Sequence, residues 1–98
     1  MPVERLEGAI ERLHGGVPLW VEEVRITETV HGLTIWDGAV QVFDIAGGPS
    51  GASRCYAWSL PVAGSEDRRV VAILHDQGVE SPLDAVRVFL VAEQQAPQ

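Results

Sequence analysis

Leu33-Thr34-Ile35-Trp36-Asp37-Gly38-Ala39-Val40-Gln41-Val42-Phe43-Asp44-Ile45 is the stretch that decides the fold, because it predicts two β-strands joined by a tight turn. Asp37-Gly38 is a strong signal for a type I′ turn, in which both central residues have positive φ. Such a turn pairs Trp36 with Ala39 and leaves both faces of the hairpin apolar. A single strand over Leu33–Ile45, with Asp37-Gly38 as a bulge, is the alternative interpretation.

The rest of the chain shows helical patterns at its two ends and strand patterns between them. Apolar residues spaced by three and four predict a helix over 2–14, which ends at Gly15-Gly16. Alternating residues predict strands over 17–30, 53–60 and 68–75, although a short helix at Leu19–Glu23 remains open for the first. His31-Gly32 predicts a turn that leads into the hairpin, and glycine-rich 46–52 is typical of a loop. Ser81, Pro82 and Asp84 predict the start of a second helix, followed by a frayed tail over 94–98.

This order of elements predicts a single α+β domain over residues 1–98: helix, antiparallel meander of three or four strands, helix. We expect both helices on one face of the sheet, since two helices of about 13 residues that pack about 8–10 Å apart cover only one face. Helices approach a sheet most closely over small side chains. The face of Cys55, Ala57 and Ser59 is therefore the one that we expect the helices to cover.

The topology resembles that of double-stranded-RNA-binding domains, and its strands-then-helix half resembles antitoxins of the HicB type. These are similarities of fold, and they imply little about activity. The net charge of −7 disfavours nucleic-acid binding, which needs clustered basic residues on phosphates. An acidic inhibitor or antitoxin-like decoy is a weaker alternative that this charge suggests. All seven basic residues are arginine, so lysine-dependent P-loop and Schiff-base chemistry are excluded.

The pattern of histidine and cysteine predicts neither a metal site nor a catalytic centre, and it calls for no cofactor. His14, His31, His75 and Cys55 do not have the spacing of metal ligands. The lone cysteine excludes an intrachain disulfide and indicates a reducing, cytoplasmic setting. No secretory signal and no membrane-spanning apolar run are expected. The alternative to a non-enzymatic protein is a small-ligand or enzymatic pocket between sheet and helices, with His75 or Asp44 as its polar group.

The candidate binding residues are Trp36, Arg54, Tyr56 and Trp58. Arg54, Tyr56 and Trp58 alternate along one side of a strand, and aromatic residues and arginine are enriched at interface hot spots. If the helices cover the opposite face, this aromatic face stays open, and monomers rarely leave such patches wet. The expected function is therefore self-association as a homodimer, or binding of another protein, through this face.

A second resemblance rests on two segments of the chain, Trp36-Asp37-Gly38-Ala39-Val40-Gln41-Val42-Phe43-Asp44 and Arg54-Cys55-Tyr56-Ala57-Trp58. Together they resemble the core of small bacterial proteins that have no assigned activity. The similarity covers about two thirds of the chain. It implies no catalytic residue and no ligand.

Overall fold

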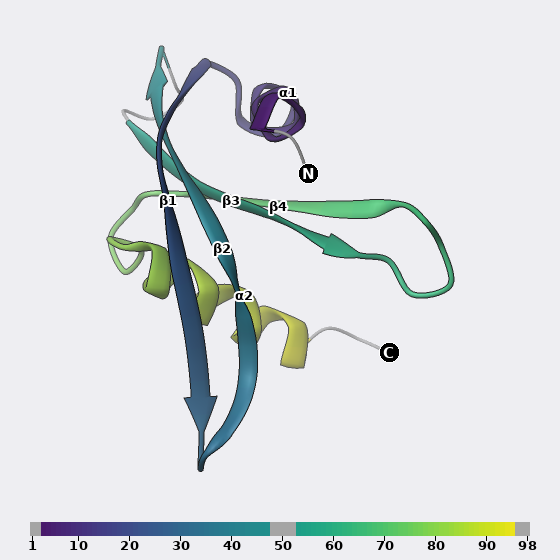
Figure 1. Cartoon of the computed structure of the whole chain (residues 1–98). Helices are drawn as coiled ribbons and strands as arrows, with labels where there is room; N and C mark the ends of the chain where they lie inside the picture. Colours follow the sequence, from purple (N-terminus) through teal and green to yellow (C-terminus); the bar gives the residue numbers. More distant parts are fainter. Residues whose placement is uncertain (1–2, 48–52, 96–98) are drawn as a thin grey trace.

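The protein has two helices and one four-stranded antiparallel sheet (Figure 1). The structure is a computed structural model that describes residues 3–47 and 53–95. Its elements are α1 (Val3–His14), β1 (Val17–Val30), β2 (Leu33–Ala46), β3 (Arg54–Pro61), β4 (Arg68–Leu74) and α2 (Pro82–Gln95). The strands lie in the order β1-β2-β3-β4, which confirms the α+β meander between two helices. The loop predicted over 46–52 lies mostly outside the described residues, as does the end of the predicted tail, whose first two residues belong to α2.

The tight turn lies at His31-Gly32, so the prediction of a turn at Asp37-Gly38 is wrong. His31 and Gly32 have φ values of 51° and 78°, as a type I′ turn requires. Asp37 and Gly38 are instead inside β2, where they pair with Thr27 and Ile26 of β1. The alternative of one long strand is therefore confirmed, although the extra residue of β2 is Ile35 and not part of Asp37-Gly38.

The turn moves to His31-Gly32 because β1 is long enough to pair with β2 along its whole length. Both strands have 14 residues, and their ladder runs from Val17↔Ala46 to Val30↔Leu33. This pairing also settles Leu19–Glu23, which is strand and contains a bulge at Val21. A turn at Asp37-Gly38 would leave β1 without this partner, so the longer ladder decides the register.

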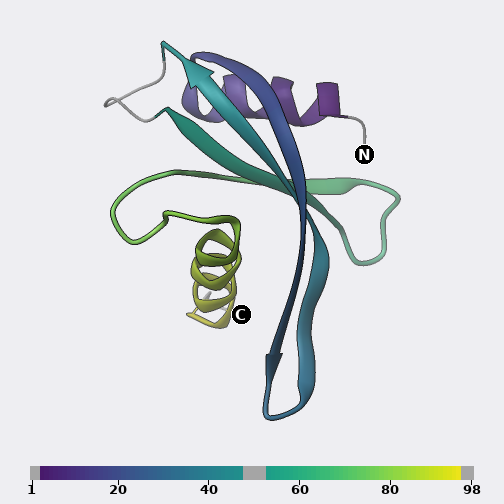
Figure 2. The same ribbon diagram turned by 60° about the vertical axis from the view of Figure 1, so that its left-hand side comes forward.

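The two helices pack on opposite faces of the sheet, and the expectation that they share one face is wrong. In Figure 2 the sheet runs between α1 and α2. Leu6 and Ile10 of α1 pack with Phe43 and Cys55, whereas α2 packs on the other face. Neighbouring strand residues point to opposite faces. Both faces of the sheet centre are apolar, so each of them receives one helix.

Each helix covers a separate core cluster. The cluster beneath α2 is the larger and is built from Val40, Val42, Tyr56, Trp58, Val71, Val79, Ala85, Val86 and Phe89. The cluster beneath α1 contains Leu6, Ile10, Phe43, Ile45, Cys55 and Ala57. Of the small residues predicted to lie under a helix, Cys55 and Ala57 do so, under α1 alone, whereas Ser59 lies outside this cluster and is bonded to Arg68.

Side-chain hydrogen bonds cap α2 and attach both helices to the sheet. The Ser81 hydroxyl accepts a hydrogen bond from the Asp84 backbone N–H at 3.1 Å, which confirms Ser81 as the N-cap of α2. At the end of α1, His14 Nε2 lies 2.8 Å from the carbonyl oxygen of Ala72. An ion pair from Arg87 to Glu28 joins α2 to β1, and this hydrogen bond holds the pKa of the Glu28 carboxyl below its usual value.

The burial of Cys55 predicts a chemically inert thiol. Burial raises the pKa of Cys55 to about 12, so almost none of the reactive thiolate is present near neutral pH. We expect iodoacetamide at pH 8 to alkylate the native protein on the order of 100-fold more slowly than the protein in guanidinium chloride. Mass spectrometry of quenched time points measures both rates. Equal rates would mean that the cluster under α1 is open to solvent.

Candidate functional site

The sheet opens into a fork where β2 and β3 part. The β2–β3 ladder contains only the pairs from Gln41↔Ala57 to Asp44↔Arg54. Beyond it β2 continues to Leu33 beside β1, and β3 continues to Pro61 beside β4. We call the gap between residues 36–41 of β2 and residues 58–61 of β3 the fork. Pro61 has no N–H to donate to a ladder, which is consistent with the parting of the strands here.

One side of the fork is an unpaired strand edge. The Ile45 N–H donates a hydrogen bond to the Ser53 carbonyl at 2.8 Å, so odd-numbered residues in this part of β2 direct their backbone groups away from β1. Two of them, Asp37 and Ala39, lie beyond the end of the β2–β3 ladder. Their backbone N–H and C=O groups therefore point into the fork without a paired strand. This edge is a template for an additional strand.

The other side of the fork is occupied by a side chain of the protein itself. Arg68 Nε donates to the Ser59 hydroxyl at 2.9 Å, and its NH2 group donates to the Ser59 carbonyl at 3.2 Å. Ser59 is the residue that would face Ala39 if the ladder continued by one more bonded pair. The arginine thus satisfies the carbonyl on the β3 side and leaves the β2 side open.

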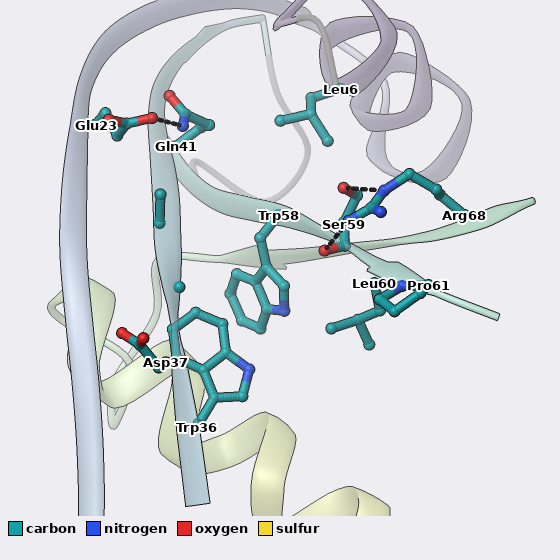
Figure 3. A pocket seen from close by; sticks show the side chains of 12 residues that line it. Leu6, Glu23, Trp36, Asp37, Gln41, Trp58, Ser59, Leu60, Pro61 and Arg68 are labelled. Carbon is teal, nitrogen blue, oxygen red and sulfur yellow. Dashed lines mark hydrogen bonds between the residues drawn. The ribbon is translucent and has the colours of Figure 1, made fainter. Parts of the chain in front are cut away.

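The fork contains a cavity of about 400 Å³ with an aromatic floor (Figure 3). Trp36 and Trp58 contact each other edge to face, with ring centroids 5.7 Å apart and planes at 72°. The Trp36 ring also lies over Gly38, where a Cβ atom would come within 3.0 Å of it. Any side chain at position 38 would therefore have to displace the indole slightly, and glycine leaves it in place.

The floor includes a polar group without a hydrogen bond. The Trp58 side chain is 97% buried, and its indole Nε1 has no hydrogen-bond partner among the described residues. In Figure 3 the nitrogens of both indoles lie on the side of Leu60 and Pro61. A buried donor without an acceptor costs about 1–3 kcal/mol. The floor of the fork therefore contains a buried donor that no described residue satisfies.

The β2 wall of the fork is acidic and hydrogen-bonded. Asp37 accepts hydrogen bonds from Thr27 at 3.0 Å and from Arg25 at 3.3 Å. The Gln41 amide donates to Glu23 at 2.8 Å and accepts from the Trp20 indole at 2.8 Å. These contacts hold the carboxylates of Asp37 and Glu23 beside the open edge.

A second cavity, of about 510 Å³, is lined by Asp44, Ile45, Ser53, Arg54 and His75. Arg54 donates from Nε and NH2 to one oxygen of Asp44, both at 3.1 Å. His75 Nδ1 lies 2.7 Å from the Tyr56 hydroxyl. Burial raises the pKa of Tyr56 above its ordinary value, so this phenol stays neutral. The structure thus brings together the two polar residues, Asp44 and His75, that the sequence suggested for a ligand pocket.

The residues predicted as an open aromatic face lie elsewhere than expected. Tyr56 and Trp58 are only 2% and 3% exposed because α2 covers them, and Trp36 is half-buried beside them. The expectation that this face lacks a helix is wrong. Arg54 lies at the second cavity. The open strand edge at Asp37 and Ala39 was missed, because these residues were assigned to a hairpin.

Comparison with known proteins assigns neither a family nor a function to this chain. No protein-family model matches this chain, and neither the curated proteins nor the solved structures contain a significant match. Within residues 3–47 and 53–95, no group of three His, Cys, Asp or Glu side chains is placed to hold a metal ion. Neither helix of the described chain is long and apolar enough to cross a membrane.

The open edge predicts an alternating pattern of amide hydrogen exchange along β2. We expect the amides of Asp37 and Ala39, which face the fork, to exchange at least tenfold faster than those of Gly38 and Val40, which face β1. Exchange of the ¹⁵N-labelled protein followed by NMR measures all four. Equal protection at all four positions would mean that the fork edge is already paired.

Proposed function

We propose that this chain is a non-enzymatic protein-interaction domain that binds a segment of a partner protein at the fork. The observation that carries the proposal is the edge of β2 at Asp37 and Ala39, which is left without a strand where β2 and β3 part. Backbone groups on such an edge bind another chain by strand addition in many recognition domains. A setting in the cytoplasm, where a lone thiol such as Cys55 stays reduced, is part of this proposal.

The surroundings of the edge also support a protein ligand. The cavity has tryptophans in its floor, and tryptophan is enriched in residues that dominate binding energy. The carboxylates of Asp37 and Glu23 line the cavity together with Arg68, and Arg25 pairs with Asp37 at 3.3 Å. Within a chain of net charge −7, the two carboxylates beside the edge favour a basic segment. In this proposal the partner contacts the strand edge of β2, and the tryptophans form the floor of the cavity beneath that edge.

A small-ligand site at the second cavity is the other candidate. Its supporting observation is that the Arg54–Asp44 pair and His75, which is hydrogen-bonded to Tyr56, line one cavity. Arginine and histidine side chains bind carboxylate and phosphate groups by charge-assisted hydrogen bonds. Here Asp44 already occupies Arg54, so a small anion would have to compete with this carboxylate.

Photo-crosslinking in cells tests the protein-interaction proposal. With benzoylphenylalanine in place of Asp37, we expect one discrete crosslinked species, because the side chain stands beside the open edge. With the same residue in place of Glu66, in the exposed β3–β4 turn, we expect none. Gel mobility and mass spectrometry identify the adduct, and an adduct of two 10.6-kDa chains would identify the partner as a second copy.

The control for this experiment fills the cavity. Ala39→Trp places a large side chain in the cavity, and we expect it to abolish the adduct formed from position 37. An adduct that survives this change, or that forms equally from position 66, would refute binding at the fork. No adduct from either position would have the same consequence.

Titration with inorganic phosphate and with acetate, followed by NMR, tests the second candidate. We expect saturable shifts of the His75 ring signals. Arg54→Gln should weaken the affinity for the anion roughly tenfold or more, because a charge-assisted hydrogen bond is lost. Arg12→Gln, on the exposed side of α1, is the matched control and should leave the affinity unchanged. Shifts that do not saturate, or that are equal in both variants, would rule out an anion site at this cavity.

A further inference from the structure

We infer that the segment bound at the fork is an extended strand in which basic and apolar residues alternate, and that it pairs with β2 and not with β3. This inference rests on the proposed function and specifies the chemistry of the partner. It combines the direction of the unpaired backbone groups with the side chains that surround them.

The choice of β2 follows from the two sides of the fork. The backbone groups of Asp37 and Ala39 are directed into it. On β3 the corresponding carbonyl of Ser59 already accepts a hydrogen bond from Arg68. The next residue of β3 in the same orientation is Pro61, which has no N–H. A strand entering the fork thus finds a continuous ladder only on β2.

The alternation follows from the two faces of the added strand. Side chains beside Asp37 and Ala39 project to the face of α1, where the carboxylates of Asp37 and Glu23 line the cavity. The intervening side chains face the floor of the cavity on the side of α2, where Trp36 contacts Trp58 and Leu60 lines the same cavity. Lysine or arginine therefore suits the first set of positions, and a β-branched or aliphatic residue suits the second.

The outer edge of β1 is the competing site for strand addition, and it is protected. Pro18 cannot donate a hydrogen bond, and its partner Ile45 directs its backbone toward β3, so Pro18 faces outward from β1. The bulge at Val21 interrupts the same edge, and Glu22 and Glu23 follow it. Proline, a bulge and charged residues are features that discourage pairing at a sheet edge.

The length of the open edge sets the size of the segment. From Gln41, where the ladder with β3 ends, β2 keeps its regular alternation to Trp36, and after the bulge at Ile35 it runs on to Leu33. At about 3.3 Å per residue, a segment of roughly six to eight residues spans this edge. A peptide of eight residues is therefore a suitable probe.

The experiment uses an acetylated and amidated peptide of four Val-Lys repeats and the full-length ¹⁵N-labelled protein. We expect saturable binding, with exchange of the Asp37 and Ala39 amides slowed at least tenfold in the complex. The outward-facing amides of β1 should keep their exchange rates. Protection of β1 in place of Asp37 and Ala39 would overturn the inference, and so would binding without protection of either edge.

Two N-methylated forms of the peptide test strand pairing directly, because a strand pairs through every second amide. One form carries methyl groups on the lysine amides and the other on the valine amides. We expect one form to lose affinity at least tenfold and the other to keep it. If the added strand is antiparallel to β2, methylation of the lysine amides should cause the loss. If it is parallel, methylation of the valine amides should cause it. Equal affinities of the two forms would exclude strand addition.

Charge is tested with a Val-Glu peptide of the same length and with Asp37→Asn. We expect no saturable binding of the acidic peptide and several-fold weaker binding of the Val-Lys peptide to the variant. Asp67→Asn, in the exposed β3–β4 turn, is the matched control and should bind normally. If the crosslink from position 37 forms but these peptides do not protect β2, the proposed function stands and the inference about the strand fails.

Discussion

The short ladder between Gln41–Asp44 and Arg54–Ala57 is the contact on which the rest of the structure depends. It is the only place where the β1–β2 and β3–β4 ribbons pair in the described chain. The Val42↔Tyr56 pair points to α2, and the next pair, Phe43↔Cys55, points to α1. Both core clusters therefore meet at this ladder, on opposite faces. Neighbouring residues of a strand point to opposite faces, so two successive pairs of this ladder contact different helices.

Such a short ladder leaves both ribbons free to diverge, and side chains hold them together beyond it. On the α2 side Trp36 of β2 contacts Trp58 of β3, and Trp58 contacts Phe89 of α2 with ring centroids 5.5 Å apart. The Arg87–Glu28 pair then attaches α2 to the long β1–β2 ribbon. These contacts all lie on the face of α2. The opposite face of the fork has no equivalent aromatic contact among the described residues, and it is the face that Asp37 and Ala39 line.

Local patterns in the sequence were sufficient to predict the helices and strands, but not how these elements are arranged in space. The capping of α2 by Ser81 and the turn residues His31-Gly32 are local signals, and both were recognised. Asp37-Gly38 is an equally good local turn signal, and only the length of the β1–β2 ladder decides between the two turns. The apolar character of both sheet faces was visible too. The side on which each helix packs depends on contacts far apart in sequence, so the exposure expected for Tyr56 and Trp58 was wrong for a reason that no local pattern contains.

The candidate site was hidden by the same limitation, since a strand edge exists only once the strands have been placed. Trp36 and Trp58 were identified as residues of interest, but their positions beneath the edge depend on where β3 leaves β2. The signal that came closest was Pro61, because a proline at the end of a predicted strand marks the limit of a ladder. Outer edges of a sheet are open to any strand, and here the edge of β1 has proline, a bulge and charge against it. The edge at Asp37 and Ala39 carries the charge of Asp37 and ends at the bulge at Ile35, but it has no proline, and it lies inside the fork between β2 and β3. The position of this edge inside the fork, with β3 and β4 on the other side of the cavity, thus limits access to it where β1 relies on a proline.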